Sequence, residues 1–282
     1  MSGPGASVTV VIPVWDDYVE FLTEAVESVR RNSPEAPIVV VDNASMTPVP
    51  ELEGCAVVRS PRRLSVGAAR SLGLESVTTE YVVFLDADDE LLDGTIEFLH
   101  GRIAADPGLA VCATSILDGA TGERHRVPRR FVPRLTRWPR AFAFANSVWS
   151  LLPIQGCAIF RTGQVREAGG YPDIDWGDDW VLAVSLAFRG RVEVSERLGR
   201  YYRSTPGSLW RRPRPSRELS ASAGRVRERM REDPAVPHWA RALLPVIAVL
   251  QITVIYLVRP AYRAARADSS RHLATRGRCR LP

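Results

Sequence analysis

The fold of this chain is decided by the stretch Tyr81-Val82-Val83-Phe84-Leu85-Asp86-Ala87-Asp88-Asp89. Its apolar first half predicts a buried strand, and its second half places three carboxylates directly after that strand. An ionised carboxylate beside a hydrophobic core is costly unless positive charge compensates it, and a divalent cation with a polyphosphate ligand would do so. The alternative is that Asp89 or Asp93 caps a helix beginning near Thr95, which would leave Asp86 and Asp88 unexplained.

Apolar runs and helical patterns alternate along the first third of the chain. The predicted strands cover residues 8–14, 38–42, 56–59 and 81–85, and the predicted helices cover 20–31 and 65–77. Strands separated by helices imply right-handed crossovers and a parallel sheet covered on both faces. In such sheets, ligands bind beyond the carboxyl ends of the strands. Pro13, Asp42 and Asp86 all fall at such ends, so this edge is the predicted site.

The pattern loosens after a further strand predicted at 109–114. Residues 118–150 hold seven Arg among several Pro and aromatic residues, which is typical of a long functional loop or lid. Regular structure is expected again in a strand near 155–161. It is followed by a helix that opens at 176–180 and by a charged helix over 216–231.

Size and cysteine content point to an intracellular globular protein. The 282 residues can form one large domain or one domain with an appendage, and the four Cys include no Cys-x-x-Cys pair, so reduced thiols are expected. Residues 1–6 lack the basic start of a signal peptide, and the apolar run 8–14 is too short for its core. We therefore expect the catalytic part to be cytoplasmic.

Charge is distributed unevenly along the chain. Residues 1–196 hold 18 Arg against 27 acidic residues, whereas residues 197–282 hold 19 Arg against 5, and there is no Lys. A basic tail can contact anionic lipid or nucleic acid. It lacks the aromatic residues that interleave with basic ones on a nucleic-acid surface, so no nucleic-acid partner is expected.

Five motifs, in this order, resemble the family 2 glycosyltransferases with the GT-A fold. They are Pro13 after the first strand, Asp42-Asn43-Ala44-Ser45 after the second, Gly67-Ala68-Ala69-Arg70-Ser71-Leu72-Gly73-Leu74, the acidic stretch 86–89, and Gly177-Asp178-Asp179-Trp180-Val181-Leu182. The resemblance covers about residues 7–210. It implies an α/β, Rossmann-like, mostly parallel sheet flanked by helices. It also implies inverting transfer of a sugar from a nucleotide-diphosphate sugar to an acceptor hydroxyl, with Mg²⁺ or Mn²⁺.

The resemblance implies nucleotide-sugar binding by Pro13, Asp42, Arg70 and Asp86. Asp42 would accept a hydrogen bond from the base or ribose, but capping of the turn that follows it is an equal alternative. Arg70 would reach the diphosphate or pair with an Asp of the cluster, with a surface arginine as the alternative. Asp86 would face the ribose or the ion, and Asp88 would ligate the ion.

The second acidic motif is expected to carry the chemistry. Asp179 would be the general base that takes the acceptor hydroxyl's proton, with Asp178 beside it, although either could simply cap the following helix. The family usually has Glu at the position of Asp178. Trp176, Trp180 and Arg203 are candidate acceptor-binding residues.

One departure from the family concerns the metal. Where the family often has a His ligand, this chain has Thr205. Either the ion is held by Asp88, diphosphate and water, or metal dependence is weakened.

The C-terminal part is expected to be an appendage. The predicted domains are a catalytic domain over 1–210, with a nucleotide-binding half 1–115 and an acceptor half 116–210, and a basic helical extension over 211–282. Residues 242–258 are nearly all apolar but sit at the short limit for a membrane span. Basic flanks favour contact with the inner face of the plasma membrane through 240–280, with a true span or a packing or oligomer helix as alternatives. The Arg-rich residues 124–140 could then hold the phosphate of a lipid-linked acceptor.

Two other functions compete with this prediction. A sugar nucleotidyltransferase needs a Gly-rich basic loop after its first strand, where this chain has Pro13-Val14-Trp15-Asp16-Asp17. A degenerate domain that only binds a nucleotide sugar or acts as a scaffold would keep the fold without turnover. The base, the sugar, the oligomeric state and the acceptor, whether glycan, lipid-linked or small molecule, are left open.

Overall fold

The computed structural model describes residues 7–47, 49–50, 52–119, 124–125, 131–152, 154–203 and 215–260. The strands of this part form one nine-stranded sheet in the order β3-β2-β1-β4-β8-β6-β9-β5, with β7 paired to β6. They are β1 (Val8–Val14), β2 (Ile38–Asp42), β3 (Cys55–Arg59), β4 (Tyr81–Phe84), β5 (Glu90–Leu91), β6 (Leu109–Asp118), β7 (Arg124–His125), β8 (Ala158–Arg161) and β9 (Arg191–Tyr202).

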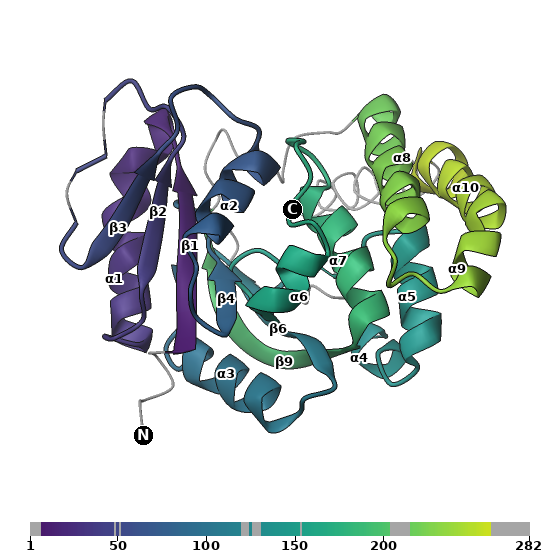
Figure 1. Cartoon of the computed structure of the whole chain (residues 1–282), viewed down its shortest axis with the longest axis horizontal. Coiled ribbons are helices and arrows are strands. Elements are labelled where there is room, and N and C mark those ends of the chain that lie inside the picture. Colours follow the sequence, from purple (N-terminus) through teal and green to yellow (C-terminus); the bar gives the residue numbers. More distant parts are fainter. Residues whose placement is uncertain are drawn as a thin grey trace, which may run out of the picture.

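Helices cover both faces of this sheet (Figure 1). The helices of the described residues are a 3-10 helix (Asp16–Phe21), α1 (Leu22–Asn32), α2 (Val66–Glu75), α3 (Thr95–Ala105), α4 (Val132–Leu135), α5 (Pro139–Val148), α6 (Thr162–Glu167), α7 (Asp178–Arg189), α8 (Ser216–Glu232), α9 (His238–Ala242), α10 (Leu244–Thr253) and a π-helix (Val254–Val258), of which α8 to the π-helix lie outside these two layers.

Strand β1 lies inside the parallel half of the sheet. It pairs in parallel with β2 and with β4, and β3 extends this half beyond β2. The second half is mixed, because β8 runs antiparallel to both β4 and β6 whereas β6 and β9 are parallel. The predicted α/β fold with a mostly parallel sheet is confirmed, and the carboxyl ends of β1 and β4 meet at one edge.

Two hydrophobic cores lie on the two faces of the sheet. The apolar sides of α1 and α3 pack on one face, through residues such as Leu22 and Leu99. On the other face α2, α5, α6 and α7 contribute to a second core that includes Phe142 and Leu182. Burial of these side chains is the main stabilising term of the fold and holds the helices against the two faces of the sheet.

The prediction that Asp89 or Asp93 caps α3 was wrong. The residue at the N-cap of α3 is Gly94, in the left-handed region with φ of 72°, and no side chain of that residue can cap. Instead Asn32, at the end of α1, accepts hydrogen bonds from the backbone N–H groups of Thr95 and Ile96, at 2.8 and 3.3 Å. The free N–H groups at the helix start are therefore satisfied by a distant residue, which leaves Asp89 for another role.

The segment 118–150 is more regular than expected. Its described part contains β7, α4 and α5, and Phe142 of α5 is buried in the core. The prediction of one long loop was therefore wrong for residues 132–148. The arginines at 126, 129 and 130 lie outside the described residues, whereas Arg134, Arg137 and Arg140 are exposed. The phosphate contact expected of residues 124–140 stays a prediction.

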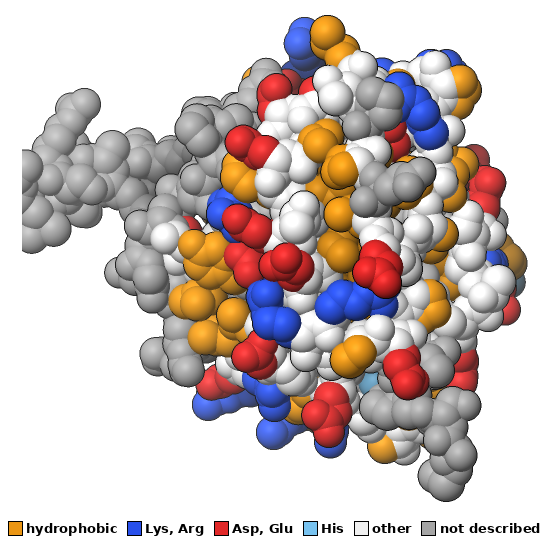
Figure 2. All heavy atoms as spheres, turned by 90° about the vertical axis from the view of Figure 1, so that its left-hand side faces the viewer, with side chains coloured by type: hydrophobic (Ala, Val, Ile, Leu, Met, Phe, Trp, Pro, Cys, Tyr) orange, Lys and Arg blue, Asp and Glu red, His pale blue; other side chains and the backbone are white. Residues whose placement is uncertain are grey.

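The C-terminal helices pack against α7 through a shared hydrophobic cluster. Val226 and Met230 of α8, together with Ile247 and Ile255, share a hydrophobic cluster with Trp180 and Val184 of α7. The predicted domain boundary near residue 210 lies outside the described residues and stays a prediction. On the side of the molecule formed by β3 and α1, acidic and basic side chains are interspersed (Figure 2).

Candidate active site

A pocket opens at the edge where β1 and β4 end, as predicted for a parallel sheet. It is lined from four directions: by Pro13 and Trp15 after β1, by Asp86 and Asp88 after β4, by residues 175–179 at the start of α7, and by Arg200 and Tyr202 of β9. Val66 and Arg70 of α2 also line it, as do Tyr18, Ala87, Ile116 and Gln155.

Helix α2 is fixed to the far side of the pocket through its first turn. The Ser65 hydroxyl caps the helix by accepting from Ala68 N–H at 3.1 Å, and it donates to Asp173 at 2.6 Å. The N–H groups of Val66 and Gly67 donate to Asp175 and to the carbonyl of Ile174. The helix N-terminus is therefore satisfied by residues 173–175, which draws α2 and the start of α7 together.

This docking brings Arg70 between two carboxylates that are far apart in the sequence. Arg70 is buried, donates to Asp86 Oδ1 at 2.5 Å from Nη2, and forms a second ion pair with Asp178 from Nη1. Burial alone would lower the pKa of Arg70, but the charges of Asp178 and Asp86 outweigh it and raise the pKa above its ordinary value. Of the two predicted contacts for Arg70, the structure has the pairing with the acidic cluster.

A second buried arginine lies on the other side of the same cluster. Arg200 pairs with Asp89 and lies 3.7 Å from Asp86 Oδ2, and its Nη1 donates to the carbonyl of Gln155. Burial disfavours ionised Asp86, but Arg70 and Arg200 hold its pKa below the usual range. Two guanidinium groups thus compensate three carboxylates, those of Asp86, Asp89 and Asp178.

The surroundings of Asp88 differ from those of the neighbouring carboxylates. Its half-buried side chain lines the pocket, and no described arginine forms an ion pair with it. Burial, together with the nearby charge of Asp86, raises the pKa of Asp88 to about 6, and Arg200 and Arg203 offset this only in part. Asp88 is therefore a carboxylate of the pocket that an additional cation would stabilise in its ionised form.

Asp178 and Asp179, the first two residues of α7, lie in different environments. Gly177 is the N-cap, with φ of 74°, so neither acid occupies the capping position. Asp178 is buried against Arg70, and burial raises its pKa to about 6 in spite of that partner. Asp179 is only partly buried and lines the pocket, where its Oδ1 accepts from the N–H of Trp180 at 2.8 Å.

The two predicted tryptophans lie in different places. Trp176 lines the pocket, together with Trp15 and Tyr18 from the end of β1. Trp180 is buried, and its indole N–H donates to the carbonyl of Asn146 at 2.5 Å, so it belongs to the core between α5, α7 and α8. Of the two, the structure brings Trp176 to the wall of the pocket.

Asp42 is buried beside this pocket's edge rather than in its described lining. Its Oδ1 accepts from Ser45 N–H at 2.9 Å, and its Oδ2 pairs with Arg59. The turn-capping alternative for Asp42 is therefore the arrangement in the structure. Pro13, the other predicted residue from these two strand ends, does line the pocket.

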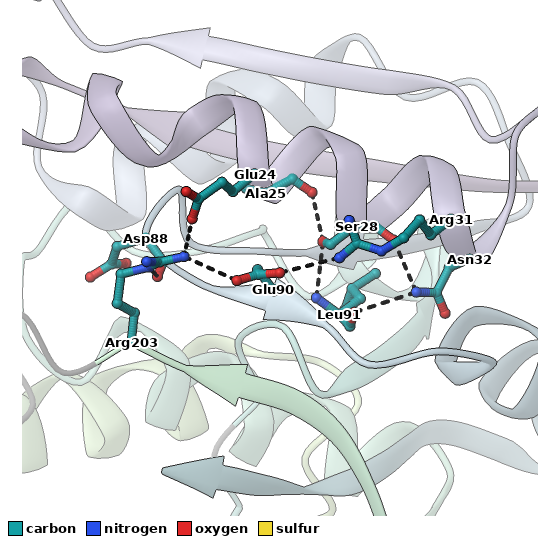
Figure 3. Close-up of polar contacts among 9 residues, drawn as sticks. All are labelled: Glu24, Ala25, Ser28, Arg31, Asn32, Asp88, Glu90, Leu91 and Arg203. Carbon is teal, nitrogen blue, oxygen red and sulfur yellow. Dashed lines mark hydrogen bonds and ion pairs between the residues drawn. The ribbon is translucent and has the colours of Figure 1, made fainter. Parts of the chain in front are cut away.

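Arg203 lies behind the acidic loop and supports it (Figure 3). Its backbone N–H donates to Asp89 Oδ1 at 3.0 Å. In the side chain, Nε donates to the carbonyl of Asp88 at 3.2 Å, and Nη2 pairs with Glu24 of α1 and Glu90 of β5. The guanidinium thus ties β5 and the loop before it to α1. Thr205 lies outside the described residues.

Sequence reasoning missed Arg200 altogether. It lies on the edge of the pocket only because β9 pairs in parallel with β6 and antiparallel with β5, far from the stretch 86–89 in sequence. The available signal was an arginine directly before the aromatic pair Tyr201-Tyr202 at the end of this strand. Gln155, Asp175 and Tyr202 were also not predicted as pocket residues.

The pocket offers few protein ligands for a divalent cation. In the described part of the chain there is no group of three or more His, Cys, Asp or Glu side chains arranged to hold a metal ion. Asp88 is available as one carboxylate ligand, whereas both oxygens of Asp86 face arginines. Oxygen ligands from a bound diphosphate and water would have to supply the other positions, as Mg²⁺ commonly accepts.

Comparisons with known proteins agree with this architecture. Residues 9–168 match the family model described as Glycosyl transferase family 2. The chain is 30% identical over 209 residues to the pre-mycofactocin glycosyltransferase of two Mycobacterium tuberculosis strains, and the match covers 70% of this chain and 42% of that protein. The chain therefore spans less than half the length of these relatives.

Solved structures share the fold at low sequence identity. Residues 1–349 of S. aureus TarS in complex with UDP-GlcNAc match with a TM-score of 0.65 and 14% identity, over 88% of this chain and 72% of that one. The same TarS fragment in another crystal structure gives a TM-score of 0.63 at 13% identity, over 89% of this chain and 72% of the fragment. These likenesses place the fold in the GT-A group.

Proposed function

The chain belongs to glycosyl transferase family 2, and from this premise we propose that it transfers a sugar from a nucleoside-diphosphate sugar to an acceptor hydroxyl with inversion. One observation carries the proposal: Asp88 and Asp179 line one pocket while their neighbours Asp86 and Asp178 are both held by Arg70. Two carboxylates thus line the pocket away from Arg70, and the two beside them are held by that arginine.

We assign donor binding to the side of the pocket formed by Pro13, Trp15, Asp86 and Arg200. The aromatic ring of Trp15, over which Arg63 stacks at 4.3 Å, offers an apolar surface beside the charged cluster. Asp42 would contribute to the nucleoside site only if its pairs with Ser45 and Arg59 opened. UDP-GlcNAc, the ligand of the TarS complex, is the first donor to test.

The proposed cofactor is Mg²⁺ or Mn²⁺, with Asp88 as the protein ligand. When bound, the ion would offset the negative charge that builds on the departing diphosphate. Arg200 lines the same part of the pocket, so its fixed positive charge would act in the same direction. Arg70 holds Asp86 and Asp178 in place and keeps their negative charge from accumulating in the pocket.

Asp179 is the proposed general base. As the acceptor oxygen bonds to the anomeric carbon and the bond to the diphosphate breaks, the hydroxyl proton moves to the Asp179 carboxylate. A single displacement at that carbon inverts its configuration. Asp178, paired with Arg70, would position the first turn of α7 rather than accept the proton.

The competing proposal is a domain that binds a nucleotide sugar without transferring the sugar. It differs in one respect, since turnover would be absent whatever the acceptor, while donor binding would remain. The acceptor, whether glycan, lipid-linked or small molecule, is open in the enzyme proposal. Turnover can therefore be tested first with water and simple alcohols as acceptors.

The test measures nucleoside-diphosphate release from UDP-, GDP- and dTDP-sugars, with Mg²⁺ or Mn²⁺, and the anomeric configuration of the product by NMR. We expect release from one donor class, with inversion. Asp179→Asn should lower turnover by about 10²- to 10⁴-fold. The control Asp175→Asn changes another carboxylate of the pocket and keeps an oxygen for the Val66 N–H, so it should leave most activity. Retention of configuration, or equal rates for Asp179→Asn and wild type, would overturn the assignment.

A further inference from the structure

The last described helices expose a continuous apolar stripe. Val246, Val249, Leu250, Tyr256 and Leu257 follow one another at helical spacing along α10 and the π-helix, and all are exposed, up to 63% for Val249 and 67% for Leu257. Residues 242–258 contain no charged side chain. A large apolar face of this kind in a folded protein marks a contact with another protein or with a membrane.

The opposite side of the same helices is fixed to the enzyme. Ile247 and Ile255 are buried in the cluster that α7 and α8 share. Gln251, fully buried, accepts from Arg227 of α8 and donates to the carbonyl of Ser147 of α5 at 2.8 Å. A buried amide with partners on two helices sets the rotation of α10, so the apolar stripe is held outward.

Helix α8 connects the stripe with the rim of the pocket. Ser220 and Tyr256 share a hydrogen bond between their hydroxyl groups at 3.0 Å, and Ser222, two residues later, donates to the carbonyl of Trp176 at 2.8 Å. One helix therefore contacts both the stripe and the backbone of Trp176 at the wall of the pocket.

Charge around the stripe identifies the occupant. Arg241 and Arg259 flank it, and residues 260–282 add six Arg against one Asp. A second copy of this chain would bring an identical set of arginines to the contact, whereas an anionic bilayer brings the opposite charge. Trp239 and Tyr256 each have an apolar body with a polar tip, as suits the level of lipid headgroups.

We propose that this stripe binds an anionic lipid bilayer, with the helices lying in the interface. No helix in the described ranges is long and apolar enough to cross a membrane. The run Leu244–Thr253 and Val254–Val258 together extends about 22 Å, against about 30 Å for the hydrocarbon core. A helix with one buried side and one apolar outward side meets the requirement for shallow insertion.

The test is cosedimentation of the full chain with vesicles of phosphatidylcholine, with and without phosphatidylglycerol, at low and high salt. Wild type should bind the anionic vesicles, and high salt should weaken that binding. Leu257→Asp and, separately, Val249→Asp should weaken it by at least about tenfold. Met46→Asp is the matched control, because Met46 is 92% exposed and lies outside the stripe. It should bind like wild type.

Melting temperatures of all variants should match, since the changed side chains are exposed. Equal binding to neutral and anionic vesicles, no binding by wild type, or unchanged binding of both stripe variants would overturn the proposal. Sedimentation velocity distinguishes the other occupant. A dimer that Leu257→Asp dissociates, in a chain that does not bind vesicles, would assign the stripe to a second copy and overturn it as well.

Discussion

Asp86 and Asp88 lie two residues apart after β4 and line the same pocket, yet only Asp86 faces arginines at ion-pair distance within the described structure. The pKa values of the two carboxyl groups therefore shift in opposite directions. Arg70 and Arg200 overcome the effect of burial and lower the pKa of Asp86, whereas burial and the charge of Asp86 raise the pKa of Asp88 to about 6. The folded protein therefore maintains Asp88 in the pocket without an arginine at ion-pair distance, at a cost to its own stability.

Asp88→Asn should stabilise the protein at neutral pH. Because the pKa of Asp88 is higher in the folded state than its ordinary value of 3.8, folding favours the protonated form. The stabilising effect of that proton is present below pH 3.8 and lost as pH rises to about 6. Above this range the variant should be more stable by about 1 to 3 kcal/mol, and the difference should vanish near pH 4.

Urea unfolding at pH 4 and pH 7.5, without divalent ions, measures this difference. Asp93→Asn, at an exposed site on the same stretch, controls for the loss of one surface charge. A destabilised Asp88→Asn at pH 7.5 would mean that Asp88 has a compensating partner and is not the open ligand position.

Replacement of Arg70 by Met should destabilise the fold strongly. The change leaves the buried Asp178 and the partly buried Asp86 without their shared cation, and removal of one partner from a buried ion pair costs about 3 to 5 kcal/mol. Arg102→Met is the matched control, since Arg102 pairs with Glu193 at 2.7 Å on the surface. There the loss should be about 0 to 1 kcal/mol. Equal losses in chemical denaturation would contradict the view that Arg70 organises the site.

Gly67→Ala should separate α2 from the start of α7. A methyl group at Gly67 would collide with the carbonyl of Pro172 and come within 3.1 Å of Asp178 Cβ. We expect a loss of about 1 to 3 kcal/mol and weaker donor binding, because Arg70 would move away from Asp178. Gly101→Ala in α3, where an added Cβ meets nothing within 4 Å, should instead stabilise the protein by about 0.5 to 1 kcal/mol. Thermal unfolding of both variants tests this, and a neutral Gly67→Ala would refute the close contact.

Arg203→Ala should weaken donor binding in the presence of metal, although Arg203 itself would not contact the donor. The Arg203 side chain donates to the carbonyl of Asp88 and pairs with Glu24 and Glu90, so its loss removes these supports of the loop that carries the ligand (Figure 3). The bond from the Arg203 backbone N–H to Asp89 would remain. Loss of a residue that holds a metal ligand in place lowers metal affinity by about 10- to 100-fold. Arg31→Ala removes the other partner of Glu90 and leaves the loop contacts, so it should have little effect. A dependence of binding on Mn²⁺ concentration that is the same in both variants would show that Arg203 has no such role.

The strands of the N-terminal half could be predicted because each is a short, local, apolar pattern. Residues 8–14 and 38–42 were predicted with the observed bounds, and the acidic residues after β4 do line a pocket. The order of these motifs, combined with the family resemblance, was enough to predict a candidate site at one edge of the sheet, where the structure has a pocket.

Contacts between distant residues could not be predicted in the same way. The pairing of Arg70 with Asp178 spans 108 residues, and the cap that Asn32 supplies to α3 spans 63. Arg200 reaches the cluster only through the pairing of β9, and Trp180 is turned into the core by the packing of α7 on α5 and α8. Such contacts depend on tertiary structure, which leaves no periodic signal in the sequence.

The most direct test is calorimetric titration of nucleoside-diphosphate sugars, beginning with UDP-GlcNAc, into wild type, Asp88→Ala and Asp179→Asn, each with Mn²⁺ or Mg²⁺ and with EDTA. We predict that one donor class binds wild type and Asp179→Asn with similar affinity when metal is present, and that Asp88→Ala binds it at least about tenfold more weakly. Equal binding by Asp88→Ala and wild type, or no binding of any donor by folded protein, would contradict the account.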